Sequence, residues 1–260
     1  MEPAWSSQFE PGALQPVAPL PLDAPITRDW AWGGATGAGV RVAIIDSGVD
    51  AAHPAVGAVA GAVAVEPDDG APGGVRVVPA EGDLFGHGTA CAGIICATAP
   101  EAEVYSVRVL GSNLRGRGSA FAGGLRWAID HEMHVVNMSL STRKRDYFAL
   151  FHELADEAYF RGIMLVSAVD NVEGPTYPSQ YSSVFSVAAH ARRDPLGFDF
   201  NPSPPAEFGA PGIDVEVAWL DGSTVRATGN SFAAPHIAGL VARILSKHPG
   251  LKPFQMKTVL

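Results

Sequence analysis

The sequence is poor in cysteine and holds no long apolar run. Only two of its 260 residues are cysteines, Cys91 and Cys96. They lie five positions apart in a segment with helical spacing, so their side chains point to different faces and we expect no disulfide. No stretch of about 20 apolar residues is present, which argues against a membrane partner. The first residues carry neither the basic nor the apolar region of a signal peptide, and with the free thiols this predicts a cytoplasmic protein.

Basic residues are also scarce. The chain has 18 Lys and Arg against 27 Asp and Glu, for a formal net charge of -9. A nucleic-acid interface needs clustered cations to neutralise phosphates, so we expect no nucleic-acid partner. Residues 143–145 (Arg-Lys-Arg) form the one basic cluster. A solvated loop is the more common explanation of so short a run.

Proline is concentrated at the start of the chain. Residues 1–26 contain six prolines, a density that excludes a regular helix or a central strand. The sequence predicts a Pro-rich N-terminal arm over 1–26, either packed on the rest of the protein or disordered. With 47% hydrophobic residues overall, the chain is long and apolar enough to bury one large core, so we expect a single domain over 27–260.

Beyond the arm, short apolar runs alternate with segments of helical period. Continuous β-branched runs predict buried strands at 40–45, 104–110, 135–140, 163–168 and 184–189. Apolar residues at three- and four-residue spacing predict helices at 87–97, 119–132, 146–161 and 231–247. Gly, Pro and Asp mark 66–86 and 192–212 as loops. The alternation predicts an α/β fold, a three-layer sandwich with a mostly parallel central sheet flanked by helices, with its sites at the carboxyl ends of the strands.

Two polar residues stand where such a fold places its chemistry. Asp46 ends the first buried strand, where a carboxylate could orient a histidine, although an Asp that caps the following turn is the more common explanation. His87 is flanked by Gly86 and Gly88, so no bulky neighbour shields it and a core role explains it poorly. It is therefore a candidate general base.

Ser231 opens the last predicted helix after a glycine-containing turn. Its hydroxyl would be exposed, and its backbone N–H would point toward a developing oxyanion. A plain N-cap role for Asn230 or Ser231 fits the same pattern. That role leaves Pro235 unexplained, because this residue lies inside the predicted helix and would normally be excluded from it. Ser231 is the candidate nucleophile.

In the order Asp46, His87 and Ser231, the three segments resemble the signature blocks of subtilisin-like serine proteases. The resemblance covers about residues 30–260. It implies a serine endopeptidase in which the three residues form a catalytic triad. It also implies that Asn171, at the end of a strand-like block, donates its amide to the oxyanion.

The resemblance further implies a groove in which an extended peptide pairs with the protein backbone, with the S1 pocket beside it. The implied substrate-binding residues are Ser139, Leu140 and Ser141 on one side, Gly116, Arg117 and Gly118 on the other, and Ala168 and Asp170 near the oxyanion residue.

Four positions depart from the family pattern. Ala90 stands where many members have a second His that is not part of the triad, so activity should survive. Asp170 stands where a glycine usually precedes the oxyanion Asn, and its carboxylate would oppose a developing negative charge unless it points away or is screened. With the net negative charge of the chain, it would favour cationic substrates by steering. Ser141 and Thr142 stand where glycines usually form a pocket wall. They either narrow the S1 pocket or face solvent.

The resemblance implies no cofactor. The segment after the His87 helix is short and lacks the loop that in many subtilisins wraps a tight calcium ion, so a strong calcium site is not expected, although Asp68, Asp69 and Asp83 could form a weak one. Cys91, one turn beyond His87, resembles the thiol of some family members, and packing is its expected role.

The sequence therefore predicts a protease that acts on a peptide or protein, with an intracellular or precursor-processing role. Two alternatives stay open. A peptide macrocyclase would resolve the acyl-enzyme with an amine and would need a lid against water, for which no helical insertion is visible. A catalytically silent peptide-binding protein would keep the groove, with turnover blocked by Asp170 or a malformed oxyanion hole.

Overall fold

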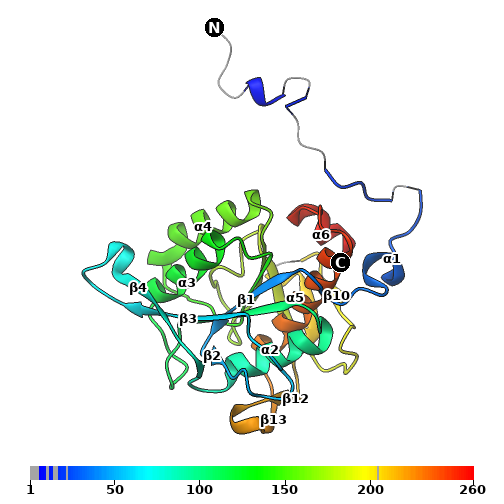
Figure 1. The fold of residues 1–260 in the computed structure, drawn as a ribbon. Helices are drawn as coiled ribbons and strands as arrows, with labels where there is room; N and C mark the ends of the chain where they lie inside the picture. Colours follow the sequence, from blue (N-terminus) through cyan, green and yellow to red (C-terminus); the bar gives the residue numbers. More distant parts are fainter. Residues whose placement is uncertain (1–5, 10–11, 14–16, 22, 204) are drawn as a thin grey trace.

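The computed structural model describes residues 6–9, 12–13, 17–21, 23–203 and 205–260. Its centre is a nine-stranded sheet with the order β10-β11-β9-β8-β7-β1-β6-β3-β4. Figure 1 shows the central strands between two layers of helices. All neighbouring strands from β11 to β3 are parallel, and an antiparallel strand closes each edge. The strands are β1 (Arg41–Asp46), β3 (Gly61–Pro67), β4 (Val75–Pro79), β6 (Glu103–Arg108), β7 (Val135–Met138), β8 (Met164–Ala168), β9 (Phe185–His190), β10 (Asp199–Phe200) and β11 (Phe208–Pro211).

Helices cover both faces of this sheet. They are α1 (Arg28–Trp32), α2 (His87–Thr98), α3 (Gly118–Asp130), α4 (Phe148–Phe160), α5 (Asn230–Lys247) and α6 (Pro253–Val259). Val42 and Ile44 of β1 pack in the cluster that contains α2 and α5. Ala43 and Ile45, which point the opposite way, pack in the cluster that contains α3 and α4. Since both faces of β1 are buried, its continuous apolar run is explained, and the predicted three-layer α/β sandwich is confirmed.

The five predicted strands and four predicted helices are all present, but the two predicted loops are not simply loops. Residues 66–86 contain β4 and the short β5 (Gly82–Asp83), which pairs with β2 (Gly48–Val49). Residues 192–212 contain β10 and β11. These strands are short and lie at or near a sheet edge, and β4 and β11 end in Pro, so the turn signals around them hid the strands.

The described part of the predicted arm forms a 3-10 turn at Ser6–Phe9 and then meets the domain. Ala18, Leu20 and Ile26 are partly buried against the core. The Gln255 side chain donates a hydrogen bond of 2.6 Å to the Ala18 carbonyl. The rest of the prediction falls on residues 1–5, 10–11, 14–16 and 22, outside the described residues. Within the part that the structure describes, no helix has the length and apolar character needed to cross a membrane.

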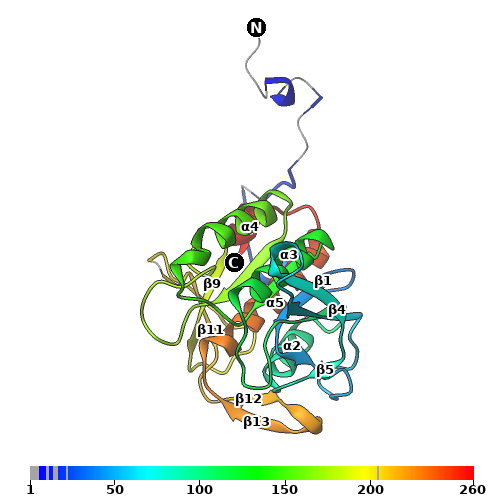
Figure 2. The same ribbon diagram turned by 90° about the vertical axis from the view of Figure 1, so that its left-hand side faces the viewer.

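A hairpin of β12 (Val215–Ala218) and β13 (Thr224–Ala227) packs beside α2, on the side of the sheet away from α4 (Figure 2). The central position of β1 matters more for function. The chain runs from β1 to β3 and β6 on one side and then crosses to β7 on the other. Such a reversal opens a crevice at the carboxyl end of the central strand. Asp46 ends β1, Ser139 follows β7, and Asn171 lies shortly after β8, so all three converge on that edge.

Helix α2 passes very close to the end of β1. A Cβ added to Gly88 would lie 2.0 Å from the Gly48 carbonyl oxygen and 3.1 Å from Cβ of Asp46. Glycine at position 88 therefore permits an approach that any side chain would block. This approach brings the first residue of α2, His87, next to the last residue of β1.

We predict that Gly88→Ala lowers the free energy of unfolding by about 1–3 kcal/mol, because the new methyl group overlaps a backbone atom that cannot rotate away. Urea denaturation measures the change. Gly70→Ala is the matched control, since the nearest atom to its added Cβ is Asp68 Oδ1 at 3.5 Å. Equal stability of the two variants would contradict the close packing of α2 on β1.

Candidate active site

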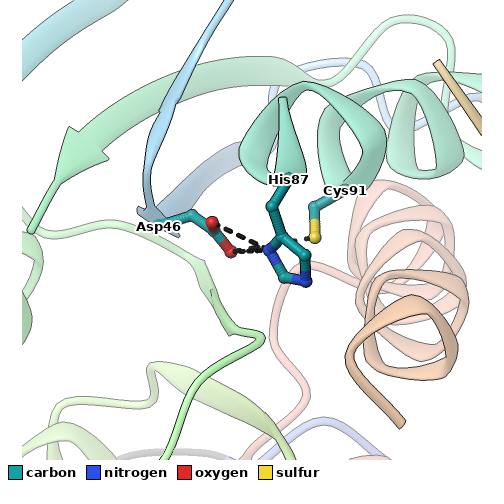
Figure 3. Close-up of side chains that lie close together, drawn as sticks. All are labelled: Asp46, His87 and Cys91. Atoms are coloured by element: carbon teal, nitrogen blue, oxygen red, sulfur yellow. Dashed lines mark hydrogen bonds and ion pairs between the residues drawn. The ribbon is translucent and has the colours of Figure 1, made fainter. Parts of the chain in front are cut away.

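His87 and Asp46 form a buried pair at the start of α2 (Figure 3). Nδ1 of His87 lies 2.9 Å from each carboxylate oxygen of Asp46. The backbone N–H of Ser47 donates a further bond of 2.7 Å to Oδ1. The carboxylate is fully buried and the imidazole is 6% exposed, so the bonds replace lost water. They also fix the ring with Nε2 as its remaining polar atom.

The charge of His87 follows from this setting. Burial lowers its pKa, but the negative charge of Asp46, the hydrogen bond to it and the charge of Asp83 act in the opposite direction. The net effect raises the pKa above its ordinary value of 6.5. A raised pKa means that the folded protein stabilises the imidazolium, as a base that must accept a proton requires.

Asp83 is a structural anchor for the start of α2. Its Oδ1 accepts hydrogen bonds from the Ser47 hydroxyl and from the N–H groups of Phe85 and Gly86. Its Oδ2 accepts from the N–H and the hydroxyl of Thr89. Sequence reasoning missed this role and considered the residue only as a metal ligand.

The described residues do not bring Asp68, Asp69 and Asp83 together as one cluster of ligands, and weak calcium binding by them stays a prediction. Both carboxylate oxygens of Asp83 accept hydrogen bonds from other residues of the protein, and Asp69 pairs with Arg117. Among the described residues, the one group of three clustered ligand-type side chains is Asp46, His87 and Cys91. Two of its members are the buried ion pair and the third is a thiol.

Ser231 is the second residue of α5, and Pro235 lies four residues further on. Proline has no N–H, so the Ser231 carbonyl has no helical partner at position 235. The Ser139 hydroxyl takes this acceptor with a bond of 2.8 Å. A plain N-cap role left Pro235 unexplained. In the structure, Pro235 leaves the Ser231 carbonyl free to accept the bond from Ser139, which joins the start of α5 to the end of β7.

Ser231 and His87 face the same cleft. Both side chains line it, and the ring of Phe232, next to Ser231, packs 5.3 Å from the imidazole between ring centroids. Among the hydrogen bonds of the described residues, none joins the Ser231 hydroxyl to His87. Catalytic hydrogen bonds often form only when a substrate closes the site. We therefore expect the bond between the Ser231 hydroxyl and His87 to form in the substrate complex.

Asn171 is held by the start of the same helix. Its Oδ1 accepts a bond of 2.9 Å from the backbone N–H of Asn230, which directs its amide NH2 group away from that contact. Asn171 also lines the cleft. The oxygen is thus engaged by the protein while the donor end is left for a ligand.

Asn230 was missed by sequence reasoning, which considered it only as an N-cap. Its Oδ1 accepts from the Ala189 N–H at 2.8 Å, and its Nδ2 donates to the carbonyls of Val169 and Asp170. One side chain therefore joins the residues after β8 to strand β9 and to the start of α5. The signal in the sequence was an amide directly before Ser231, since an amide can both donate and accept.

Asp170 is screened. Its Oδ2 lies 3.5 Å from Nε of Arg143, and its Oδ1 accepts from the Val172 N–H at 2.9 Å. Arg143 also donates to the carbonyls of Val172 and Glu173. Residues 143–145 are exposed, as expected of a solvated loop, and Arg143 in addition contacts the Asp170 carboxylate and anchors the loop after β8.

All of the sequence-predicted site residues except Asp46 line one cleft of about 450 Å³, which we call the main cleft. Asp46 lies behind His87. The predicted residues that line it are His87, Ser231, Asn171, Ser139, Leu140, Ser141, Gly116, Arg117, Gly118, Ala168 and Asp170. Thr142, beside Ser141, lines it too, so both face the cleft. Sequence reasoning missed Leu110, Leu114, Phe121, Lys144 and Val169, which flank the predicted segments and carry no motif of their own.

A mostly parallel three-layer sandwich with a buried Asp–His pair and a helix-opening serine at one edge defines the class of subtilisin-like proteins. A solved cold adapted subtilisin-like serine proteinase superposes with a TM-score of 0.70 and 26% identity, over 90% of this chain and 85% of that chain. The subtilase family model matches residues 37–260. The chain belongs to the subtilase family, a family of peptidases.

Curated relatives agree with this membership. The chain is 34% identical over 236 residues to the thermostable alkaline protease of Halalkalibacterium halodurans, covering 86% of this chain and 62% of that protein. It is 32% identical over 238 residues to subtilisin BL of Lederbergia lenta, covering 86% and 82%. It is 33% identical over 236 residues to subtilisin E of Bacillus subtilis, covering 83% and 58%. The chain thus spans less than two thirds of the first and third of these relatives.

We predict that the imidazole of His87 titrates in the folded protein with a pKa above 6.5, and that Asp46→Asn lowers this pKa because the main stabilising charge is lost. Nitrogen-15 NMR of the histidine rings measures both values without any need for activity. Asp130→Asn, at the exposed end of α3, is the control with the same loss of charge. A His87 pKa that is unchanged in Asp46→Asn would contradict the pairing.

Proposed function

We propose that the protein is a serine endopeptidase with Ser231 as nucleophile, His87 as general base and Asp46 as the residue that orients the base. The observation that carries this proposal is the buried Asp46–His87 pair, whose imidazole lines the same cleft as Ser231 and Asn171. The proteases named among the relatives support it.

In the proposed reaction, the Ser231 hydroxyl attacks the scissile carbonyl while Nε2 of His87 accepts its proton. The imidazolium that forms is stabilised by the Asp46 carboxylate. It returns the proton to the departing amine, which leaves an acyl-enzyme on Ser231. A water molecule, activated by the same imidazole, then releases the carboxylic acid and restores the serine.

The proposed oxyanion donors are the side-chain amide of Asn171 and the backbone N–H of Ser231. The contact of Asn171 Oδ1 with the Asn230 N–H favours an orientation in which the NH2 group faces the cleft. The Ser231 N–H lies in the first turn of α5, where the helix dipole also favours negative charge. Loss of one such donor raises the barrier by about 3–4 kcal/mol in subtilisin, where it has been measured.

An extended substrate would lie in the main cleft between residues 115–118 and residues 139–142, which form its two walls. Arg115 and Arg117 on the first wall, and Lys144 shortly after the second, would make such an enzyme selective. Such selectivity favours a role in processing particular peptides or precursors over general protein degradation.

Cys91 is a competing nucleophile on proximity alone, because Sγ lies 3.9 Å from Asp46 Oδ2 (Figure 3). Burial and the charge of Asp46 raise its thiol pKa well above the ordinary value, so the reactive thiolate is suppressed. Its side chain is fully buried and its Sγ contacts Ser139 Oγ at 3.3 Å. These contacts indicate a packing role for Cys91, which favours Ser231 as the nucleophile.

We expect wild-type protein to be labelled by a fluorophosphonate probe and to cleave casein, and Ser231→Ala to lose both. The loss in kcat should be on the order of 10⁶-fold, the size measured for this change in subtilisin. Ser182→Ala, an exposed serine away from the cleft, is the control and should keep both activities.

The outcomes separate the competing functions. Labelling that persists in Ser231→Ala would refute the nucleophile. Absence of both labelling and cleavage would point to a silent peptide-binding protein, whereas labelling without cleavage of casein or a peptide library would point to an enzyme specific for one precursor or to a missing partner domain. Cyclic products from a linear peptide would point to a macrocyclase.

We also predict that a bulky mercurial inhibits slowly and that Cys91→Ala abolishes this inhibition. The reagent must displace side chains packed between α2 and Ser139, and so it distorts the helix that carries His87. Cys96→Ala is the matched control, since Cys96 is the other free thiol and is only partly buried, and it should remain sensitive. Full activity after mass spectrometry has verified modification of Cys91 would contradict the prediction.

A further inference from the structure

We propose that the main cleft selects acidic peptides, with Arg115, Arg117 and Lys144 binding carboxylate side chains of the substrate. The claim that the protein cleaves acidic peptides rests on the proposed function, whereas the preference for binding them follows from the charges of the cleft alone. It names the substrate class, which neither the motifs nor the fold specify.

The charges that line the main cleft are strongly biased. Arg115, Arg117 and Lys144 are its cationic side chains, and Asp170 is the one acidic residue among those that line it in the described part of the chain. Asp170 is already paired with Arg143. The expectation of cationic substrates depended on a free Asp170 carboxylate, and this screening removes its basis.

The cations are largely free to meet a ligand. In the described residues, Arg115 and Lys144 form no ion pair. Arg117 lies 3.5 Å from Asp69, but the two side chains are 63% and 93% exposed. A contact between such exposed groups is weak, so a substrate carboxylate held in the cleft can replace Asp69.

The positive charge continues beyond the main cleft. A neighbouring pocket of about 420 Å³ shares Arg115, Gly116 and Arg117 with it and adds Arg108. The acidic residue of that pocket, Glu66, is paired with Arg76 at 3.0 Å. A basic strip therefore follows the wall formed by the loop between β6 and α3.

The strip faces a cation on the opposite wall. Arg115 and Arg117 belong to the loop before α3, whereas Lys144 follows the segment after β7. A peptide lying between the two walls would meet positive side chains on both sides. Guanidinium groups suit carboxylates because they donate two parallel hydrogen bonds.

This local charge opposes that of the whole protein, which is -9. At physiological salt, charges more than about 8 Å apart are largely screened. The distant acidic surface therefore contributes little inside the cleft, where nearby cations dominate the field. The selection should be short-range and sensitive to salt.

The test uses one peptide scaffold with Glu, Gln or Lys at the positions N-terminal to the scissile bond. We expect kcat/KM to be about tenfold or more higher for the Glu peptide than for the Lys peptide, and the ratio to fall several-fold at high salt. The double variant Arg115→Glu/Arg117→Glu should invert the order, and Lys144→Glu should weaken it. Melting temperatures check that each variant is folded.

The control is the double variant Arg28→Glu/Arg161→Glu, which changes the net charge equally at exposed positions that do not line either pocket. It should keep the wild-type order of the three peptides. If it changes the order as much as the cleft variant does, the effect belongs to net charge and the proposed contacts are wrong.

Binding to the Ser231→Ala protein, followed by fluorescence anisotropy of labelled peptides, separates this inference from the proposed function. Equal affinity for the Glu, Gln and Lys peptides, in a protein whose wild type still takes the fluorophosphonate probe, overturns the charge selection alone. Tight binding of the Glu peptide that depends on Arg115 and Arg117, with no probe labelling of the wild type, upholds the selection and overturns the peptidase.

Discussion

Asp46 and His87 are both buried, and a carboxylate removed from water must be matched by donors of the protein. Nδ1 of His87 and the N–H of Ser47 supply these donors, and they can do so only if α2 begins against the end of β1. Glycine at 88 permits that approach. Asp83 accepts five hydrogen bonds, which join Thr89 in the first turn of α2 and the two residues before the helix to Ser47. The position of a whole helix thus follows from the need to satisfy one buried charge.

The start of α5 is fastened by a different device. Pro235 removes one helical N–H, and the Ser231 carbonyl that loses its partner bonds to Ser139 instead. Asn230 ties the preceding backbone to β9 and to the residues after β8. Hydrogen bonds thus link the first residues of α5 to three strands of the central sheet or to the residues that follow them. A shift of the Ser231 hydroxyl would require several of these bonds to break together. Such support is how a scaffold holds a reactive group within a narrow range of positions.

The fold was predictable because its signals are local. The apolar run of β1 and the glycines around His87 each report a constraint set by neighbours in the sequence. The missed features are relations between distant segments. Nothing in the sequence near Asp170 indicates that Arg143 will screen it, and Asp83 looked like a free carboxylate because Thr89 and Ser47 meet it only after folding. The edge strand β10 was hidden for a related reason, since its pairing partner, rather than its own two residues, makes it a strand. In β4, three valines favour a strand, but the Gly, Pro and Asp residues around them hid it.

Net charge illustrates the same limit in electrostatic terms. The composition sums over the whole surface and gives an acidic protein, whereas a ligand in the main cleft experiences mainly the charges within a screening length. The loop before α3 and the segment after β7 bring Arg115, Arg117 and Lys144 to one cleft, while Arg143 pairs with the nearby carboxylate of Asp170. The topology that gathers these side chains therefore sets the charge of the cleft lining, which is opposite in sign to the net charge of the molecule.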